Sequence, residues 1–371
     1  MGAGDKHKVC FEVLGVPVII RALETYNLCG STVNVVVVGA MSESVMATVN
    51  QRFHGTSYAF QEQPRGTGDA ARKGAEILER IRFEGDVLVV AGDKVIDPRV
   101  IRQLLAAHEQ SGADVTLAAA KRPANSSAGI LLKSVRGNIA GILEESERRR
   151  LVALGRINDA FRQQEKLARE TIDAVLAEVC DDKTARALAG EIWGGGGLES
   201  KVQSLKSKVQ GLESKVQGLK SKVESNVPSP SFFRAERVTM AKVLRQEEFE
   251  ERFTKEERLG CLRVGEETVP ASQVLRRFDQ MNLSTYLFRA PVLYDALGRL
   301  KPARRSDEEY LTDVFEILAR RKKPARVVGC EIQDLRELMS FNNPQELLAV
   351  EKVYRQRHGP AVVETTSVHG T

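Results

Sequence analysis

Between residues 17 and 145, short runs of β-branched residues alternate with stretches whose apolar residues recur every three or four positions. The runs at 33–38 and 87–91 have the length of buried strands, whereas the stretches at 17–28 and 68–81 have the period of helices. Strands that alternate with helices are typical of sheets covered by helices on both faces. The sequence therefore predicts an α/β fold with a Rossmann-like, doubly wound sheet.

Further segments continue this alternation. A helix capped by Ser42 is expected at 42–53, and Pro98 at a first helical position predicts another at 98–105. Residues 128–133 and 139–144 flank an Arg-Gly-Asn turn, which indicates an antiparallel hairpin and makes the sheet mixed. The remaining expected elements are strands at 58–61, 114–120, 284–288 and 325–330, and helices at 290–300, 309–320 and 344–356.

Residues 146–279 interrupt the alternation, because they are rich in Glu, Arg, Lys, Gln and Ala with helical spacing, including a stretch at 238–259. Within this helical insertion, residues 198–225 carry alternating Val and Leu at the a and d positions of a heptad repeat. Val at a with Leu at d favours a parallel two-stranded coil, while lysines at several facing e and g positions oppose it, so the number of partners stays open. We expect a homo-oligomer formed through 198–225.

These patterns divide the chain into four parts. Residues 1–145 form the first part of an α/β domain, 146–279 the helical insertion, 280–356 the second part of the domain, and 357–371 a tail expected to be disordered.

The composition mainly excludes classes of protein. No apolar run approaches the roughly 20 residues of a membrane span, and the N-terminal residues lack a signal-peptide core, so a cytoplasmic protein is expected. The net charge of +5 is low for a protein that binds nucleic acids. Basic runs at 148–150, 299–305 and 320–326 contain no interleaved aromatic residues, which favours a solvated surface over nucleic-acid binding.

Two short motifs are candidates for phosphate chemistry. Gly66 and Thr67 open a helix, where backbone N–H groups attract anions, although a plain tight turn has the same composition. Asp93 follows a strand at the carboxyl end where open α/β sheets bind ligands, and it could instead be a turn or capping residue. Asn342 precedes the last helix and would either contribute to its cap or complete a cation site with Asp93.

Seven motifs, in order, resemble those of the sugar-nucleotide pyrophosphorylases. The first half contains HKVCFEVLGVP (7–17), QEQPRGTGDA (61–70), AGDKVI (91–96) and GILE (141–144). The second half contains MNLSTYLF (281–288), EEYLTD (308–313) and SFNNPQEL (340–347). The resemblance is nearest to the uridylyltransferase domains of bacterial N-acetylglucosamine-1-phosphate uridylyltransferases, and it implies a fold of the nucleotide-diphospho-sugar transferase type over about 6–145 and 280–356.

The resemblance implies that a sugar-1-phosphate oxygen attacks the α-phosphorus of a nucleoside triphosphate, by default UTP, and releases pyrophosphate. N-acetylglucosamine-1-phosphate is the default sugar phosphate. By the family pattern Asp93 and Asn342 would hold Mg²⁺, and Lys8 would neutralise phosphate charge. Two further sets of site residues are implied: Gln61, Gly66 and Thr67 for the nucleotide, and Gly129, Glu144, Asn282 and Thr312 for the sugar.

The sequence also departs from the family pattern. The family's first strand and its L-x-A-G-x-G-T-R-M phosphate loop have no counterpart before residue 6, which places catalytic activity in doubt. No hexapeptide repeats of an acetyltransferase domain follow residue 356, so acetyl transfer is not expected. The alternative function is a non-catalytic sugar-nucleotide-binding or scaffold protein oligomerised by its coiled coil.

Overall fold

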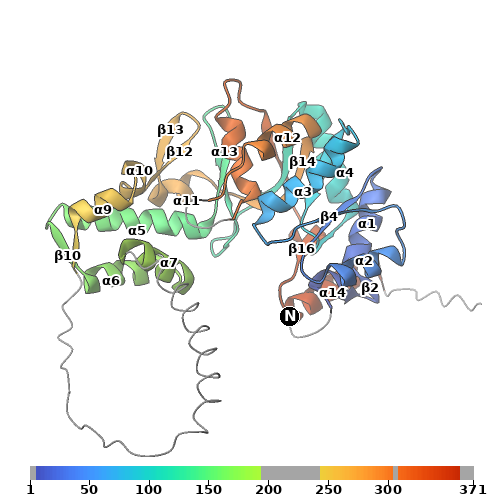
Figure 1. The fold of residues 1–371 in the computed structure, drawn as a ribbon, viewed down its shortest axis with the longest axis horizontal. Coiled ribbons are helices and arrows are strands. Elements are labelled where there is room, and N and C mark those ends of the chain that lie inside the picture. Colours follow the sequence, from blue (N-terminus) through green and yellow to red (C-terminus); the bar gives the residue numbers. More distant parts are fainter. Residues whose placement is uncertain (1–5, 194–242, 304–307, 360–371) are drawn as a thin grey trace, which may run out of the picture. The chain divides into compact units, whose positions relative to one another are not determined.

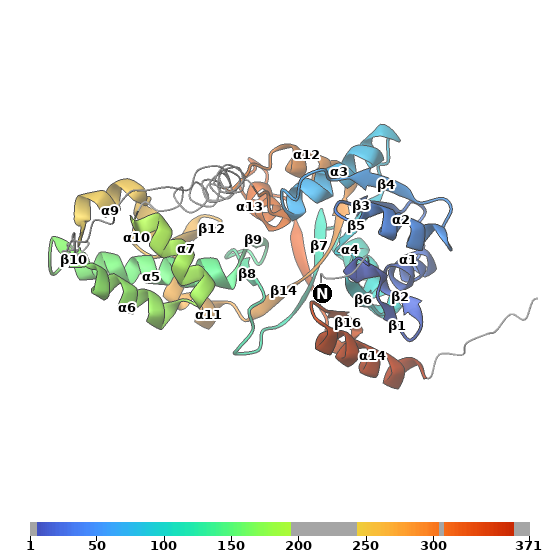
Figure 2. The same ribbon diagram turned by 60° about the horizontal axis from the view of Figure 1, so that its bottom comes forward.

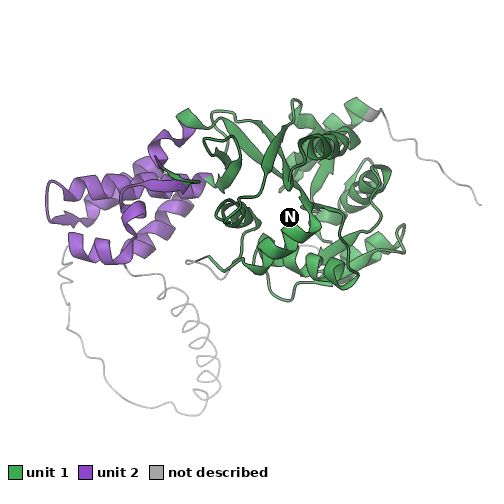
Figure 3. Cartoon of the chain, turned by 90° about the horizontal axis from the view of Figure 1, so that it is seen from above, with its two compact units in different colours: residues 1–144, 264–267, 276–371 green, residues 145–263, 268–275 purple. Residues whose placement is uncertain are grey.

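A computed structural model describes residues 6–193, 243–303 and 308–359 of the chain (Figure 1). It contains two compact units: Met1–Glu144, Val264–Glu267 and Arg276–Thr371 belong to the first, and Glu145–Arg263 and Thr268–Leu275 to the second (Figure 3). The heptad segment 198–225 lies outside the described residues, so the coiled coil stays a prediction. Within the described part of the chain, no helix combines the length and apolarity that a membrane span requires.

The first unit is built on a six-stranded mixed sheet, which confirms the α/β fold class (Figure 2). Strand β14 lies at its centre and pairs antiparallel with β5, β7 and β8, while β15 runs parallel to β7. The expected hairpin of β8 and β9 is confirmed. The strands are β5 (Asp86–Val90), β7 (Val115–Lys121), β8 (Ile130–Lys133), β9 (Ile139–Leu143), β14 (Gln280–Arg289) and β15 (Val327–Glu331).

Alternating side chains of this sheet pack against helices on both faces. Val115 and Leu117 of β7 point into a core shared with α3, α12 and α13, whereas Ala118 and Ala120 point into a core shared with α4. This alternation follows from the two-residue period of a strand. The helices are α1 (Val18–Leu28), α2 (Ser42–Asn50), α3 (Thr67–Arg80), α4 (Pro98–Ser111), α12 (Ala290–Gly298), α13 (Val314–Ala319) and α14 (Pro344–His358).

A separate parallel pair, β3 (Val35–Val38) and β4 (Ser57–Phe60), lies beside this sheet. Helix α3 packs against β3, where a Cβ on Gly74 would lie 3.3 Å from Val37. Among the described residues, no strand pairs with the second edge of β3 or with the second edge of β5. The backbone N–H and C=O groups along these two edges therefore take no part in hydrogen bonds between strands.

Short strands complete the first unit where the sequence predicted none. They are β1 (Glu12–Val13), β2 (Val16–Pro17), β6 (Lys94–Ile96) and β16 (Leu338–Ser340), which form the antiparallel pairs β1–β2 and β6–β16. Two local predictions were wrong. Met41, with φ of 58°, is the N-cap of α2 in place of Ser42, and α14 continues to His358, two residues into the expected tail.

The second unit has a helical core with two small sheets. Its apolar centre includes Leu154, Ile157, Leu176 and Phe249. The predicted helix at 238–259 was wrong from residue 243 onward, because a strand and two short helices occupy that stretch. The elements are α5 (Glu145–Phe161), β10 (Lys166–Ala168), α6 (Arg169–Val179), α7 (Asp182–Trp193), β11 (Val243–Arg245), α9 (Gln246–Arg252) and α10 (Lys255–Arg258). The hairpin β12 (Cys261–Val264) and β13 (Glu267–Pro270) and the short helix α11 (Val274–Arg277) follow.

We predict that Arg150→Ala strongly destabilises the second unit. The Arg150 side chain is 5% exposed and forms ion pairs with Glu147, Glu191 and Glu257. Breaking a buried ion network costs about 3–5 kcal/mol, because charges stay buried without their partner. Urea unfolding followed by far-UV circular dichroism measures the loss. Arg156→Ala, at an exposed ion pair on the same helix, is the control and should change stability by less than about 1 kcal/mol; equal effects would contradict the prediction.

Candidate functional site

The partner strand along one edge of β14 changes at residues 282–286, which we call the switch point. Met281, just before it, pairs with Ile130 of β8, and Thr285, within it, already pairs with Val90 of β5. On the opposite edge, the pairing with β7 shifts register between Asn282 and Tyr286. Open α/β sheets bind ligands where neighbouring strands diverge in this way. The loop after β5 and the residues before β8 therefore approach the same part of the first unit.

Asp93, in the loop after β5, forms an ion pair with Lys8. The Lys8 Nζ atom donates to Asp93 Oδ2 over 2.6 Å, and the two side chains are 37% and 15% exposed. Lys8 lies in a short 3-10 helix, Lys8–Cys10, capped by the ring of His7. Packing fixes this segment on the loop, since a Cβ on Gly92 would lie 3.4 Å from Val9. The structure thus brings together two predicted site residues that lie 85 positions apart.

Two further basic groups lie near Asp93. Lys94 opens β6 next to it, and burial lowers the pKa of the Lys94 ammonium while the charge of Asp93 opposes that shift. Burial and the charge of Lys8 lower the pKa of His7. Sequence reasoning did not name Lys94 or His7 as site residues, although both lie within quoted motifs, at 91–96 and 7–17. Basic groups around a partly exposed carboxylate are suited to bind phosphate together with a cation.

Asn342 lies shortly after a strand that pairs next to Asp93. Ser340, the last residue of β16, pairs with Lys94 of β6, and Asn342 follows two residues later. The helix-capping role belongs to its neighbour Asn343, whose Oδ1 accepts a hydrogen bond from Glu346 N at 2.9 Å. A carboxylate and an amide oxygen are donors that Mg²⁺ accepts. The described residues contain no group of three or more His, Cys, Asp or Glu side chains arranged for a metal.

Gln61, Gly66 and Thr67 also lie together, at the start of α3. Gln61 Nε2 donates to the Gly66 carbonyl at 3.1 Å, and Thr67 Oγ1 accepts from Leu311 N at 3.1 Å. Gly66 has φ of +95°, and a Cβ there would lie 2.4 Å from the Glu309 carbonyl oxygen. Glycine is therefore required at this position for two independent reasons. The segment 309–311 holds the loop in place.

The residues predicted for the sugar form a second group beside the switch point. The Gly129 carbonyl accepts from Asn282 N at 2.8 Å, and a Cβ on Gly129 would lie 3.1 Å from Glu144 Oε1. Burial of its carboxyl, and then the charge of Asp313, raise the pKa of Glu144, although part of this side chain remains exposed. Thr312 lies in the 3-10 helix Leu311–Asp313, which packs against both α3 and β9. This helix connects the two groups of residues.

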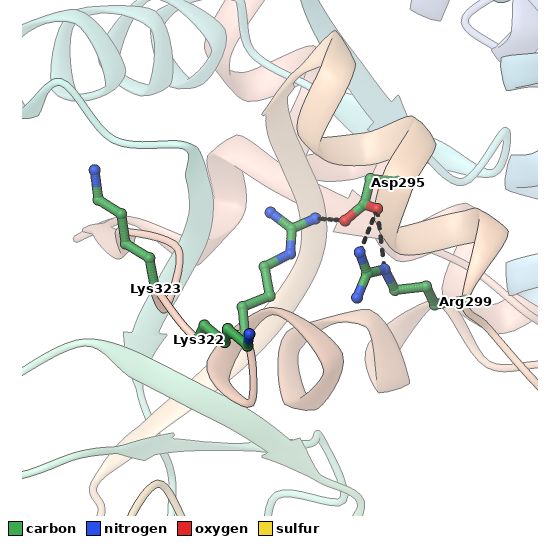
Figure 4. A pocket seen from close by; sticks show the side chains of 5 residues that line it. Asp295, Arg299, Lys322 and Lys323 are labelled. Carbon is green, nitrogen blue, oxygen red and sulfur yellow. Dashed lines mark hydrogen bonds and ion pairs between the residues drawn. The ribbon is translucent and has the colours of Figure 1, made fainter.

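A basic hollow of about 490 Å³ is lined by none of the predicted site residues (Figure 4). It is lined by Asp295, Arg299, Arg321, Lys322 and Lys323. Arg299 Nε donates to Asp295 Oδ1 at 2.9 Å, and Arg321 pairs with the second oxygen of the same carboxylate. Two of the predicted basic runs meet here, and one carboxylate neutralises part of their charge.

Comparison with known proteins found similarities in sequence and in fold. Residues 1–166 match the model of the MobA-like NTP transferase domain. The chain is 29% identical to the bifunctional protein GlmU of Geobacter metallireducens over 147 residues, and 31% identical to that of Exiguobacterium sibiricum over 144 residues. Each match covers 38% of this chain but only 30% of the relative's length. A solved UDP-glucose pyrophosphorylase complexed with UDP-glucose superposes with a TM-score of 0.47 at 10% identity, covering 94% of this chain and 90% of the other.

We predict that Gly66→Ala destabilises the first unit more than Gly112→Ala does. Both glycines have positive φ, but only at Gly66 would the added methyl collide with backbone, at 2.4 Å from Glu309. At Gly112 the substitution should lower the free energy of unfolding only by the cost of holding alanine in the left-handed conformation, roughly 1–2 kcal/mol. Thermal unfolding of both variants measures the difference. Equal midpoints would show that the contact between Gly66 and residue 309 is not tight in solution.

Proposed function

We propose that the chain belongs to the sugar-nucleotide pyrophosphorylase family and is a sugar-1-phosphate nucleotidyltransferase, because residues 1–166 match the model of the MobA-like NTP transferase domain and the ordered motifs resemble that family. An oxygen of the sugar-1-phosphate attacks the α-phosphorus of a nucleoside triphosphate, the bond to the β-phosphate oxygen breaks, and pyrophosphate leaves. UTP and N-acetylglucosamine-1-phosphate are the proposed substrates, as the resemblance of the motifs implies.

The observation that carries this proposal is the placement of two chemically different groups beside one switch point. The Lys8–Asp93 pair, with Lys94 close by, offers charges that suit phosphates and a divalent cation. Gly129, just before β8, and Glu144, just after β9, offer a carbonyl and a carboxylate that suit the hydroxyl and amide groups of a sugar. The attacking and leaving groups of the reaction need neighbouring sites of these two kinds.

Each predicted residue then has a role in the proposed reaction. Lys8 neutralises charge that develops on the phosphates, which is where electrostatic stabilisation contributes most to such reactions. Asp93 and Asn342 would hold Mg²⁺, which supplies Lewis-acid stabilisation when bound. Because this pair alone is an incomplete ligand set, phosphate oxygens and water would complete the coordination. Gln61, Gly66 and Thr67 would bind the nucleotide.

We predict that the chain releases pyrophosphate from UTP and a sugar-1-phosphate in the presence of Mg²⁺, and that Asp93→Ala and Lys8→Met each reduce this rate by about 100-fold or more. A panel of sugar-1-phosphates and nucleoside triphosphates identifies the preferred pair. Asp295→Ala is the matched control, because it also removes a carboxylate paired with basic side chains, but in the hollow away from the site.

Two outcomes would contradict the proposed function. Folded wild-type protein without turnover on the whole panel would favour the non-catalytic alternative, in which the same residues only bind a sugar nucleotide. Turnover that survives both Asp93→Ala and Lys8→Met would place the reaction elsewhere in the molecule.

A further inference from the structure

Ser284 has an unusual backbone conformation for its place in the fold. Four non-glycine residues in the described chain have positive φ: Leu14, Met41, Arg82 and Ser284. The first three lie in a hairpin turn or next to helix ends, where such conformations are common. Ser284, with φ of +52°, lies within the ten-residue strand β14. A non-glycine residue held there is unfavourable, and such strain is typically retained at functional positions.

The bulge also exposes this one side chain. From Met281 to Phe288, every residue of β14 is buried except Ser284, which is partly exposed. β-Bulges frequently redirect a side chain next to an active site. Here the bulge coincides with the change of partner from β8 to β5, so Ser284 lies between the residues predicted for the sugar and the loop that carries Asp93.

Asn282, by contrast, directs its side chain to neighbours within β14. Its Nδ2 atom donates to the Tyr286 hydroxyl at 2.8 Å, and its Oδ1 atom accepts from Ser284 N at 3.0 Å. The side chain is buried, with the residue 7% exposed. Both ends of the amide are thus engaged, and one of them holds Ser284 in its left-handed conformation.

Tyr286 supports the same arrangement from within the core. Burial raises the pKa of its hydroxyl to about 12, the charge of Glu144 adds to the shift, and hydrogen bonds with the side chains of Asn282 and Ser284 oppose it. The Ser284 hydroxyl therefore belongs to a polar cluster with Tyr286, Asn282 and Glu144. Of the three cluster residues on β14, only Ser284 is partly exposed.

We infer that Ser284 is the residue through which β14 contacts the sugar moiety of the substrate, and that Asn282 positions Ser284 instead of binding the sugar itself. This inference rests on the proposed function. It makes Ser284 a specificity-determining residue whose hydroxyl hydrogen-bonds a polar substituent of the sugar. The strained backbone is retained because it places that hydroxyl at the switch point.

Two substitutions separate this role from a structural one. Ser284→Ala removes the hydroxyl and keeps the Cβ, so the backbone strain remains. Ser284→Gly removes the hydroxyl and also relieves the strain, so its unfolding midpoint should rise above that of the wild type. In both variants the KM for the sugar-1-phosphate should increase roughly 3- to 10-fold, the effect of one lost hydrogen bond, while the KM for the nucleoside triphosphate stays unchanged.

If both variants keep the wild-type KM for the sugar-1-phosphate, the inference is overturned. It is also overturned if the KM values for the sugar-1-phosphate and for the nucleoside triphosphate change equally, because equal changes indicate a general distortion of the site. If the wild type shows no turnover, the proposed function is contradicted. The contact between Ser284 and the sugar is then tested separately, by calorimetric titration with N-acetylglucosamine-1-phosphate alone. Weaker binding by Ser284→Ala than by the wild type would support the contact. Equal affinity, or no binding by either protein, would overturn it.

Discussion

The antiparallel pairing of β14 with three other strands is the constraint on which the site depends. One edge of β14 is shared between β8 and β5, and the opposite edge binds β7. A regular strand could not change partners without a break in register, and the bulge at residues 282–286 provides that break. Because the side chains around the bulge are buried, its position is fixed by the core, and so are the loop after β5 and the residues before β8.

Segments distant in sequence then fix the two halves of the site relative to each other within the first unit. Leu311 N donates a hydrogen bond to Thr67 Oγ1, and burial, followed by the charge of Asp313, raises the pKa of Glu144. The Lys8–Asp93 pair joins the N-terminal segment to the end of β5 over 2.6 Å. This network makes Gly66 and Gly129 necessary as glycines, since a Cβ at either position would meet atoms closer than 3.0 Å. Tight backbone packing is therefore part of how the site is positioned.

The alternation of strands and helices was predictable, because buried strands and amphipathic helices such as α3 and α4 have strong, local periodicity. The three-residue strands β6 and β16 were not, since strands this short carry no period and form only with their partner. The resemblance of the motifs predicted Lys8 and Asp93 as residues of one site. Ser284 carried no signal, because a serine's φ is set by the bulge and by Asn282 and not by its own identity.

The central claim is that one switch point of β14 serves both substrates. A crystal structure of the chain with UDP-N-acetylglucosamine and Mg²⁺ tests it most directly. The account predicts the diphosphate beside Lys8 and Asp93, with the sugar between Ser284, Gly129 and Glu144. A sugar nucleotide bound elsewhere, such as in the basic hollow around Arg299 and Arg321, would contradict the claim.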